Sequence, residues 1–168
     1  MDWAIRQGLA TGLILDSESA GNTALATGPL RSGLESRVVV NVGALGMYSY
    51  SLPADVTVVD RFGLANPISA HQHSTGRGRP GHEKDLPLAW VVASYTDPGA
   101  PAPAGVPAAE IDAARRALAC GKFPDLARAR FEPIGFKHLV RNFTGAISRW
   151  RFRFTRDPFV AVKELCGE

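Results

Sequence analysis

The chain has 168 residues, 45% of them hydrophobic, and a formal net charge of +3. This length and apolar content suffice for one folded domain with a buried core, and they exclude an intrinsically disordered chain. The sequence holds no run of about 18 consecutive apolar residues, as a transmembrane helix requires, and its N-terminus lacks the features of a signal peptide.

The first half of the chain has the pattern of a small parallel sheet. Its predicted elements are, in order, a helix at 1–10, a strand at 12–15, a loop at 16–23, a strand at 38–42, a helix at 43–50 and a strand at 56–59. The valine-rich strand at 38–42 lacks alternation, which indicates burial on both faces. Strand, helix and strand in this order predict two parallel strands joined by a right-handed crossover.

Apolar residues fill nearly all of the segment 88–95, which we interpret as a buried helix opened by Asp85 and Pro87. The segment 97–107 contains four prolines and two glycines, and it is predicted to be a surface linker. It would join a sheet-bearing half, residues 1–96, to a mainly helical half, residues 108–168.

The second half is predicted to contain helices at 107–120, 136–150 and 158–165, with a short strand at 149–154. The strand is predicted because arginine and aromatic residues alternate strictly there. The helix at 136–150 has the clearest amphipathic pattern of the chain. Its apolar stripe comprises Phe136, Leu139, Val140, Phe143, Ile147 and Trp150.

These elements predict an α/β fold, with a small, partly parallel sheet, flanking helices and a helical C-terminal half. The whole chain, residues 1–168, is expected to form a single domain. Basic residues are concentrated in the second half, where residues 115–163 include twelve lysines and arginines and three acids. A basic half favours polyanions or an anionic membrane surface, although a solvated basic face is the alternative interpretation.

The segment between Val56 and Ala93 is the predicted functional region. The strand there ends at Asp60, and a glycine-rich loop follows that carries Arg77, Arg79, His82 and Lys84. Functional residues gather on loops carried by rigid elements. Arginine and lysine donors suit an anionic or polyhydroxylated ligand. We therefore predict that substrate is bound by Asp60, Arg77, Arg79, His82 and Lys84.

A metal site is one alternative for the same region. His71, His73 and His82 provide three imidazoles, and Glu83 or Asp60 would add a carboxylate. The arginines and lysine nearby would repel a cation, so the interpretation as loop histidines is favoured and no metal is expected.

Three further interpretations have weaker support. A serine triad would combine Ser69 or Ser74 with His82 and Asp60, but the chain has no Gly-x-Ser-x-Gly elbow. The sequence GRGRP at 76–80 resembles the core of a minor-groove DNA hook, yet it occurs once, inside a folded region. Gly43 and Gly46 follow a strand as in nucleotide-binding turns, but the full glycine fingerprint is missing. We expect neither nucleic acid nor a cofactor.

Aromatic residues near arginines could stack on sugar rings. The candidates are Trp90, Tyr95, Trp150 and Phe152. Core packing is the favoured interpretation for Trp90 and Trp150.

The order of motifs in VVDRFGLANPISAH followed by GRGRPGHEKDLPLAWVVA resembles one family. It is similar to the extracytoplasmic C-terminal region of membrane-embedded C-type glycosyltransferases, above all the terminal arabinofuranosyltransferases of actinobacterial cell-wall arabinan. The resemblance covers roughly residues 37–166, and the block 81–84 is its most specific part. The chain departs from the expected pattern at His71-Gln72-His73, where an Ala-Arg continuation would stand.

This resemblance implies a full-length enzyme that transfers arabinofuranose from a polyprenyl-phosphate donor to an arabinan acceptor. The catalytic acid of such enzymes lies among the membrane helices, so no catalytic residue is expected in this chain. The implied location is the outer face of the cytoplasmic membrane. A non-catalytic module that binds glycan or a membrane surface is the alternative. In an extracytoplasmic domain, Cys120 and Cys166 are expected to form a disulfide.

Overall fold

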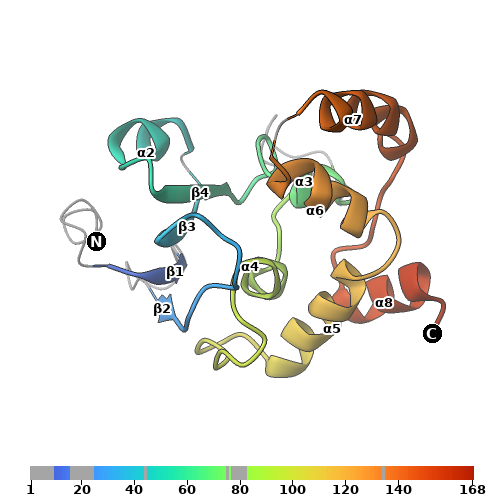
Figure 1. Ribbon diagram of the computed structural model, residues 1–168. Coiled ribbons are helices and arrows are strands. Elements are labelled where there is room, and N and C mark those ends of the chain that lie inside the picture. The colour runs from blue at the N-terminus through green and yellow to red at the C-terminus, as the bar shows by residue number, and fades with distance from the viewer. Residues whose placement is uncertain (1–9, 16–24, 44, 75, 77–82, 134) are drawn as a thin grey trace.

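A computed structural model describes residues 10–15, 25–43, 45–74, 76, 83–133 and 135–168 (Figure 1). The helix predicted at 1–10 and the loop predicted at 16–23 fall almost wholly outside these residues. The elements are β1 (Gly12–Leu15), β2 (Leu25–Thr27), β3 (Val38–Val42), α2 (Leu45–Ser51), β4 (Val56–Asp60), α3 (Pro67–Ala70), α4 (Leu88–Tyr95), α5 (Ala108–Leu118), α6 (Phe123–Phe131), α7 (Phe136–Arg149) and α8 (Pro158–Cys166).

The sheet has four strands in the order β2-β1-β3-β4. β1, β3 and β4 are parallel, with Val38 of β3 opposite both Gly12 and Val56, whereas β2 runs antiparallel to β1 at one edge. The parallel β3-α2-β4 unit confirms the predicted β-α-β pattern. The edge strand β2 is too short to be recognised by its sequence pattern.

The two faces of the sheet pack against different groups of residues. Val38, Val40 and Val42 belong to a small cluster with Ile14 and Val56, on the face whose partly buried neighbours include Leu52. The opposite face contributes to the large core, which continues through α4 into α5 and α8. Burial on both faces explains why residues 38–42 show no polar alternation.

Helix α4 is surrounded by protein. Residues 89–95 are all buried, which confirms the prediction of a buried helix. Trp90 is fully buried, and its indole N–H donates to the carbonyl oxygen of Arg156 at 2.8 Å. The Trp90 ring lies 4.8 Å from that of Phe154 and 5.7 Å from that of Phe123. Core packing of Trp90 is therefore confirmed, and α4 joins the sheet to the helical half.

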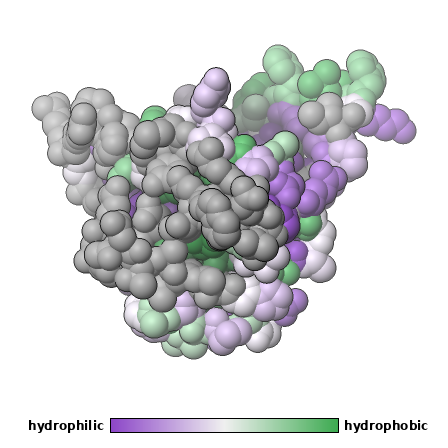
Figure 2. All heavy atoms as spheres, turned by 90° about the vertical axis from the view of Figure 1, so that its left-hand side faces the viewer, coloured by the Kyte–Doolittle hydropathy of each residue, from purple (hydrophilic) through white to green (hydrophobic). Residues whose placement is uncertain are grey.

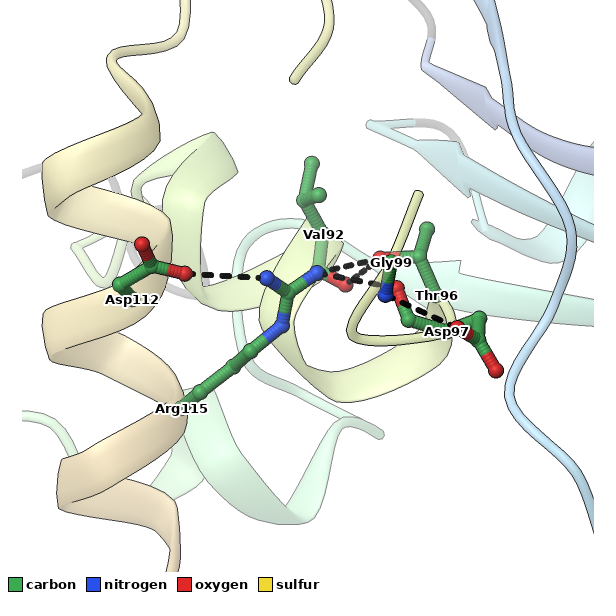
Figure 3. A network of polar contacts seen from close by, with 6 residues as sticks. All are labelled: Val92, Thr96, Asp97, Gly99, Asp112 and Arg115. Atoms are coloured by element: carbon green, nitrogen blue, oxygen red, sulfur yellow. Dashed lines mark hydrogen bonds and ion pairs between the residues drawn. The ribbon is translucent and has the colours of Figure 1, made fainter. Parts of the chain in front are cut away.

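Arg115 of α5 ties the helical half to the end of α4 (Figure 3). Its Nη2 donates to the Thr96 hydroxyl at 3.2 Å and to the Asp97 carbonyl oxygen at 3.1 Å. Its Nη1 contacts Asp112 at 3.1 Å. These bonds anchor the beginning of the proline-rich segment 97–107, which has neither helix nor strand and buries Val106 in the core.

The strand predicted at 149–154 is wrong. α7 runs to Arg149, a turn follows, and Phe154 makes only an isolated bridge to Gln72. Two of the three alternating aromatic residues nevertheless lie on one side, because Phe152 and Phe154 both pack on Phe123, at ring distances of 5.1 and 4.9 Å. Among the described residues, the segment has no neighbouring strand, so it joins no sheet.

The second half contains two more differences from the predictions. Helix α6 was missed, although Pro124 at its start and Asp125 in its first turn are typical of a helix N-terminus. Trp150 was expected in the core, yet it is 61% exposed. Among the described residues, no helix is long and apolar enough to cross a membrane.

Cys120 and Cys166 form a disulfide, as predicted, with a Cα–Cα distance of 5.3 Å. The bond links the end of α5 to the end of α8, two helices that pack along each other. It closes a loop with a sequence separation of 46 residues.

Removing this disulfide should destabilise the domain by about 4 kcal/mol, the chain-entropy value for a loop of this length. The measurement is the free energy of urea unfolding, with and without reductant. The double variant Cys120→Ser/Cys166→Ser serves as the control, because reductant should leave its midpoint unchanged. An identical midpoint for the oxidised and reduced parent would contradict the expectation.

Candidate functional site

Asp60, the first residue of the predicted site, lies at the carboxyl edge of the parallel sheet. β3 and β4 both end there, at Val42 and Asp60, and residues 61–87 lead from this edge to α4 (Figure 1). Ligands of open parallel sheets characteristically bind outside the carboxyl ends of the strands. The loop therefore begins at a common place for a binding site.

Asp60 is buried beneath the loop, with 2% of its surface exposed. Its Oδ1 accepts the backbone N–H of Phe62 at 2.9 Å, and its Oδ2 accepts that of Ala65 at 2.8 Å. The turn between them contains Gly63 at a φ of +86°, where a Cβ would meet the Ser69 backbone at 3.2 Å. Asp60 therefore holds a tight turn that glycine makes possible.

An ion pair closes the base of the loop. Arg61 contacts Asp85 with both Nε and Nη2, at 2.6 and 3.3 Å. The backbone N–H of Leu86 also donates to the Arg61 carbonyl oxygen at 3.2 Å. The two ends of the segment 61–86 are thus joined, and the segment leaves the sheet as a closed loop.

Lys84 is the second predicted residue that the structure places. Its ammonium group donates to the carbonyl oxygen of Ala70, at the end of α3. Partial burial lowers the pKa of Lys84, repulsion from Arg153 lowers it further, and Glu83 acts in the opposite direction. Arg77, Arg79 and His82 lie outside the described residues, so of the predicted set only Asp60 and Lys84 have described positions.

The unexpected His71-Gln72-His73 sequence has a structural role. His71 Nδ1 donates to the Phe152 carbonyl oxygen at 3.0 Å, which requires the tautomer protonated at Nδ1. Backbone bonds join Phe154 to His71 and His73, at 3.2 and 2.9 Å. Gln72 is buried and donates to the Asp85 carbonyl oxygen at 3.3 Å. This sequence fastens the loop to the segment that follows α7.

The alternative sites find little support in the described part of the chain. There, no three histidine, cysteine, aspartate or glutamate side chains are grouped as a metal would require. Ser69 is fully buried, and its hydroxyl donates to the Asn66 carbonyl oxygen at 3.3 Å.

Buried polar groups without partners mark the interior near this edge. Among the described residues, both amide atoms of Asn41 lack a partner, and so do Asn66 Nδ2 and Gln72 Oε1. Asn41 is fully buried in β3 beside Val59 of β4. Unpaired groups of this kind are costly and call for a partner. The sequence analysis missed Asn41, although an asparagine within a run of valines was the available signal.

A small pocket lies beside the loop, between α3, α4 and α6. Its lining includes Arg31, Ile68, Tyr95, Phe123 and Arg130. The guanidinium carbon of Arg130 lies 5.4 Å from the centre of the Tyr95 ring. Burial raises the pKa of Tyr95, and Arg130 opposes this change. The pocket offers an apolar wall with two cationic groups, and of its residues sequence analysis had singled out only Tyr95.

The described geometry predicts a pH dependence through His71. Burial lowers the pKa of His71 below its ordinary value of 6.5, and nearby Arg153, Lys84 and Arg149 lower it further, against the bond to Phe152. When the pH is lowered, His71 therefore becomes protonated at a higher pH in the unfolded chain than in the folded chain. Stability should be complete above pH 6.5 and should fall as the pH drops below it toward the lower folded pKa.

The test measures the free energy of urea unfolding at pH 7.5 and at pH 5. His71→Asn keeps an N–H donor close to the position of Nδ1 and removes the titration, so its loss of stability on acidification should be smaller than that of the parent. His73→Asn is the matched control and should behave like the parent. An equal loss in parent and His71→Asn would exclude the linkage.

Comparison with known proteins identifies the family. The AftB family C-terminal domain matches residues 21–164. Over 159 residues the chain is 31% identical to the terminal beta-(1->2)-arabinofuranosyltransferase of Corynebacterium glutamicum, covering 90% of this chain and 23% of that protein. The protein of the same description from Mycobacterium tuberculosis is 30% identical over 122 residues, covering 70% of this chain and 19% of that protein.

No solved structure matches the chain. The chain spans about a quarter or less of the length of these two relatives. The family match covers most of the described residues, from β2 through most of α8, and leaves β1 outside it. The chain therefore belongs to the AftB family, as an example of its C-terminal domain.

Proposed function

We propose that this chain is the C-terminal domain of a terminal arabinofuranosyltransferase and that it binds the arabinan acceptor at the loop above the carboxyl edge of the sheet. The family match carries the first part of this proposal. The two relatives are terminal beta-(1->2)-arabinofuranosyltransferases, a name that denotes the transfer of arabinofuranose.

The disulfide supports an extracytoplasmic position. Structural disulfides persist in oxidising compartments and are rare in the cytosol. Cys120 and Cys166 are both used in the bond, and no other cysteine occurs in the chain. The domain accordingly works at the outer face of the cytoplasmic membrane, where cell-wall glycan is assembled.

The chemistry of the loop suits a glycan. Sugar hydroxyls accept hydrogen bonds from lysine and arginine, and they donate to carbonyl or carboxylate oxygens. Lys84 is held at the loop base by Ala70, and Arg77, Arg79 and His82 precede it in the chain. In this proposal Asp60 acts by ordering the turn below them, because both of its oxygens already accept backbone N–H groups.

Catalysis is assigned to the part of the enzyme that this chain does not include. Among the described residues no group of side chains could hold a metal, and the Ser69 hydroxyl donates to a backbone carbonyl oxygen. The polyprenyl-phosphate donor would bind at that other part, and this domain would present the acceptor to it. The isolated chain should therefore show no transferase turnover.

Weak binding of an arabinofuranose oligomer should be visible by NMR titration. A few contacts to a solvated ligand imply a Kd near 1 mM, about −4 kcal/mol. Chemical-shift changes should centre on Lys84 and residues 77–82. Lys84→Gln should weaken binding about fivefold through the loss of a charged hydrogen bond of about 1 kcal/mol, whereas Lys163→Gln on α8 should not. Shifts confined to α7 and residues 150–153 would place the site elsewhere.

A domain exchange would test the family role directly. The corresponding region of the Corynebacterium glutamicum relative is replaced by this chain in cells that lack the native protein. Terminal arabinofuranose in the cell wall should be restored, and the replacement carrying Arg77→Gln/Arg79→Gln should restore it less well. Arg128→Gln/Arg156→Gln is the charge-matched control. Normal restoration by the Arg77/Arg79 variant would argue against acceptor binding at this loop.

A further inference from the structure

The helix α7 packs with its polar side toward the protein. His138 is its one residue in the buried class, with 7% of its surface exposed. Asn142, one turn later, donates to the Ala129 carbonyl oxygen at 3.4 Å and contacts His138 Nε2 at 3.1 Å. Arg149 then bonds back to the Asn142 carbonyl oxygen at 3.0 Å. These residues share one face, which is the face that meets α6.

The apolar side of α7 faces solvent. Six large hydrophobic side chains along it are between 46% and 82% exposed: Phe136, Leu139, Val140, Phe143, Ile147 and Trp150. Figure 2 shows hydrophobic residues gathered at the upper edge of the molecule, where Figure 1 places α7, with hydrophilic residues beside them. This arrangement is the reverse of the usual one, in which the apolar stripe of a surface helix faces the core.

The charges around this face are basic. α7 contains no aspartate or glutamate, and its exposed cations are Lys137 and Arg141, whereas Arg149 lies on the face that meets α6. Arg151 and Arg153 follow within four residues of its end, and the Arg151 guanidinium lies 4.8 Å from the Trp150 ring centre. Among the described residues, one of these cations has an acidic partner: Arg141 pairs with Glu132. An apolar face bordered by cations is complementary to a surface that is apolar inside and anionic outside.

We propose that α7 is a membrane-binding helix, which lies in the headgroup region of an anionic phospholipid bilayer with its apolar face toward the acyl chains. Exposed phenylalanine and tryptophan on one side and arginine and lysine on the other are typical of helices that lie in this interface. Tryptophan in particular favours the boundary between headgroups and acyl chains. A helix that protrudes at the edge of the molecule can lie flat on such a surface (Figure 1).

Membrane binding through α7 would also orient the candidate site. The segment that leaves α7 carries Phe152 and Phe154, which bond to the backbone or ring of His71 and to His73. The loop is therefore connected to α7 through these hydrogen bonds and the short segment that follows the helix. A bound helix would hold the loop at a set height above the bilayer, which adds a geometric constraint to the proposed acceptor binding but does not depend on it.

The experiment uses the purified chain with two kinds of vesicle, one of phosphatidylcholine and one of equal parts phosphatidylcholine and phosphatidylglycerol. The chain should float with the anionic vesicles and should partition at least about tenfold less onto the neutral ones. Each cation near the surface contributes about a fivefold change in partitioning. Added salt should weaken the binding, because it screens these charges.

Trp150 provides a local readout. The chain has three tryptophans, and Trp3 is replaced by Phe in every protein of this measurement, which leaves Trp90 and Trp150. Trp90 is fully buried, so a blue shift of the emission on adding anionic vesicles should come from Trp150. Trp150→Phe should lose that shift and should still float. A shift that persists in Trp150→Phe would overturn the assignment of the contact to this face.

Two variants separate the helix from the rest of the surface. Phe143→Gln/Ile147→Gln removes two exposed apolar side chains, and it should lower partitioning onto anionic vesicles by at least about tenfold. Leu64→Gln, which changes a residue that is 73% exposed elsewhere, should bind as the parent does. Circular dichroism and the thermal midpoint should be unchanged in both.

Three results would overturn the proposal. The first is failure of the parent to float with anionic vesicles, and the second is flotation of Phe143→Gln/Ile147→Gln equal to that of the parent. The third is a parent that dimerises in analytical ultracentrifugation without binding vesicles while this variant stays monomeric, which would make the face an interface between two copies.

Discussion

The burial of α4 on all sides is the constraint on which the architecture depends. Its residues touch the sheet through β1 and the helical half through α5. Trp90 adds a hydrogen bond to Arg156, a residue that lies 66 positions further along the chain. A fully buried tryptophan is stable only when its N–H finds an acceptor, so this bond and the aromatic packing must form together. The two halves therefore share a core, although a proline-rich segment separates them in the sequence.

The carboxyl edge of the sheet is held by polar contacts instead of apolar packing. Asp60 closes a turn, Arg61 and Asp85 join the ends of the loop, and His71 fastens it to the segment after α7. Each contact uses a backbone group or a paired charge, which lets polar groups remain near the interior without a large penalty. The described part of the loop is thus anchored at its base.

Two features of the described residues are unusual in a folded domain. The buried amide of Asn41 has no partner among the described residues, and the apolar side of α7 is uncovered. An unpaired buried amide costs free energy in any protein, whereas a large exposed apolar face is unusual in a protein that functions alone. The exposed face is consistent with a chain that spans about a quarter or less of the length of its relatives.

The sequence by itself determined the local elements and the family. The valines at 38–42 and 56–59 and the helix-like segment between them were enough to predict a parallel β-α-β unit, because period and composition act over a few residues. The order of motifs around Gly81-His82-Glu83-Lys84 was enough to indicate the family. The disulfide followed from that family and its compartment.

Only the tertiary structure decided which side of each element meets the protein. The periodicity of α7 predicts an amphipathic helix, but periodicity does not state whether the apolar side faces a core, and here it faces outward. The alternation at 149–154 predicts an extended segment, but a strand also needs a neighbour, and the neighbour is absent in the described fold. Asp60 looked like a ligand-binding carboxylate, and its two backbone bonds became visible only when the turn was folded. Partners in space are set by contacts between residues far apart in the chain, and the local patterns at these three positions carry no information about them.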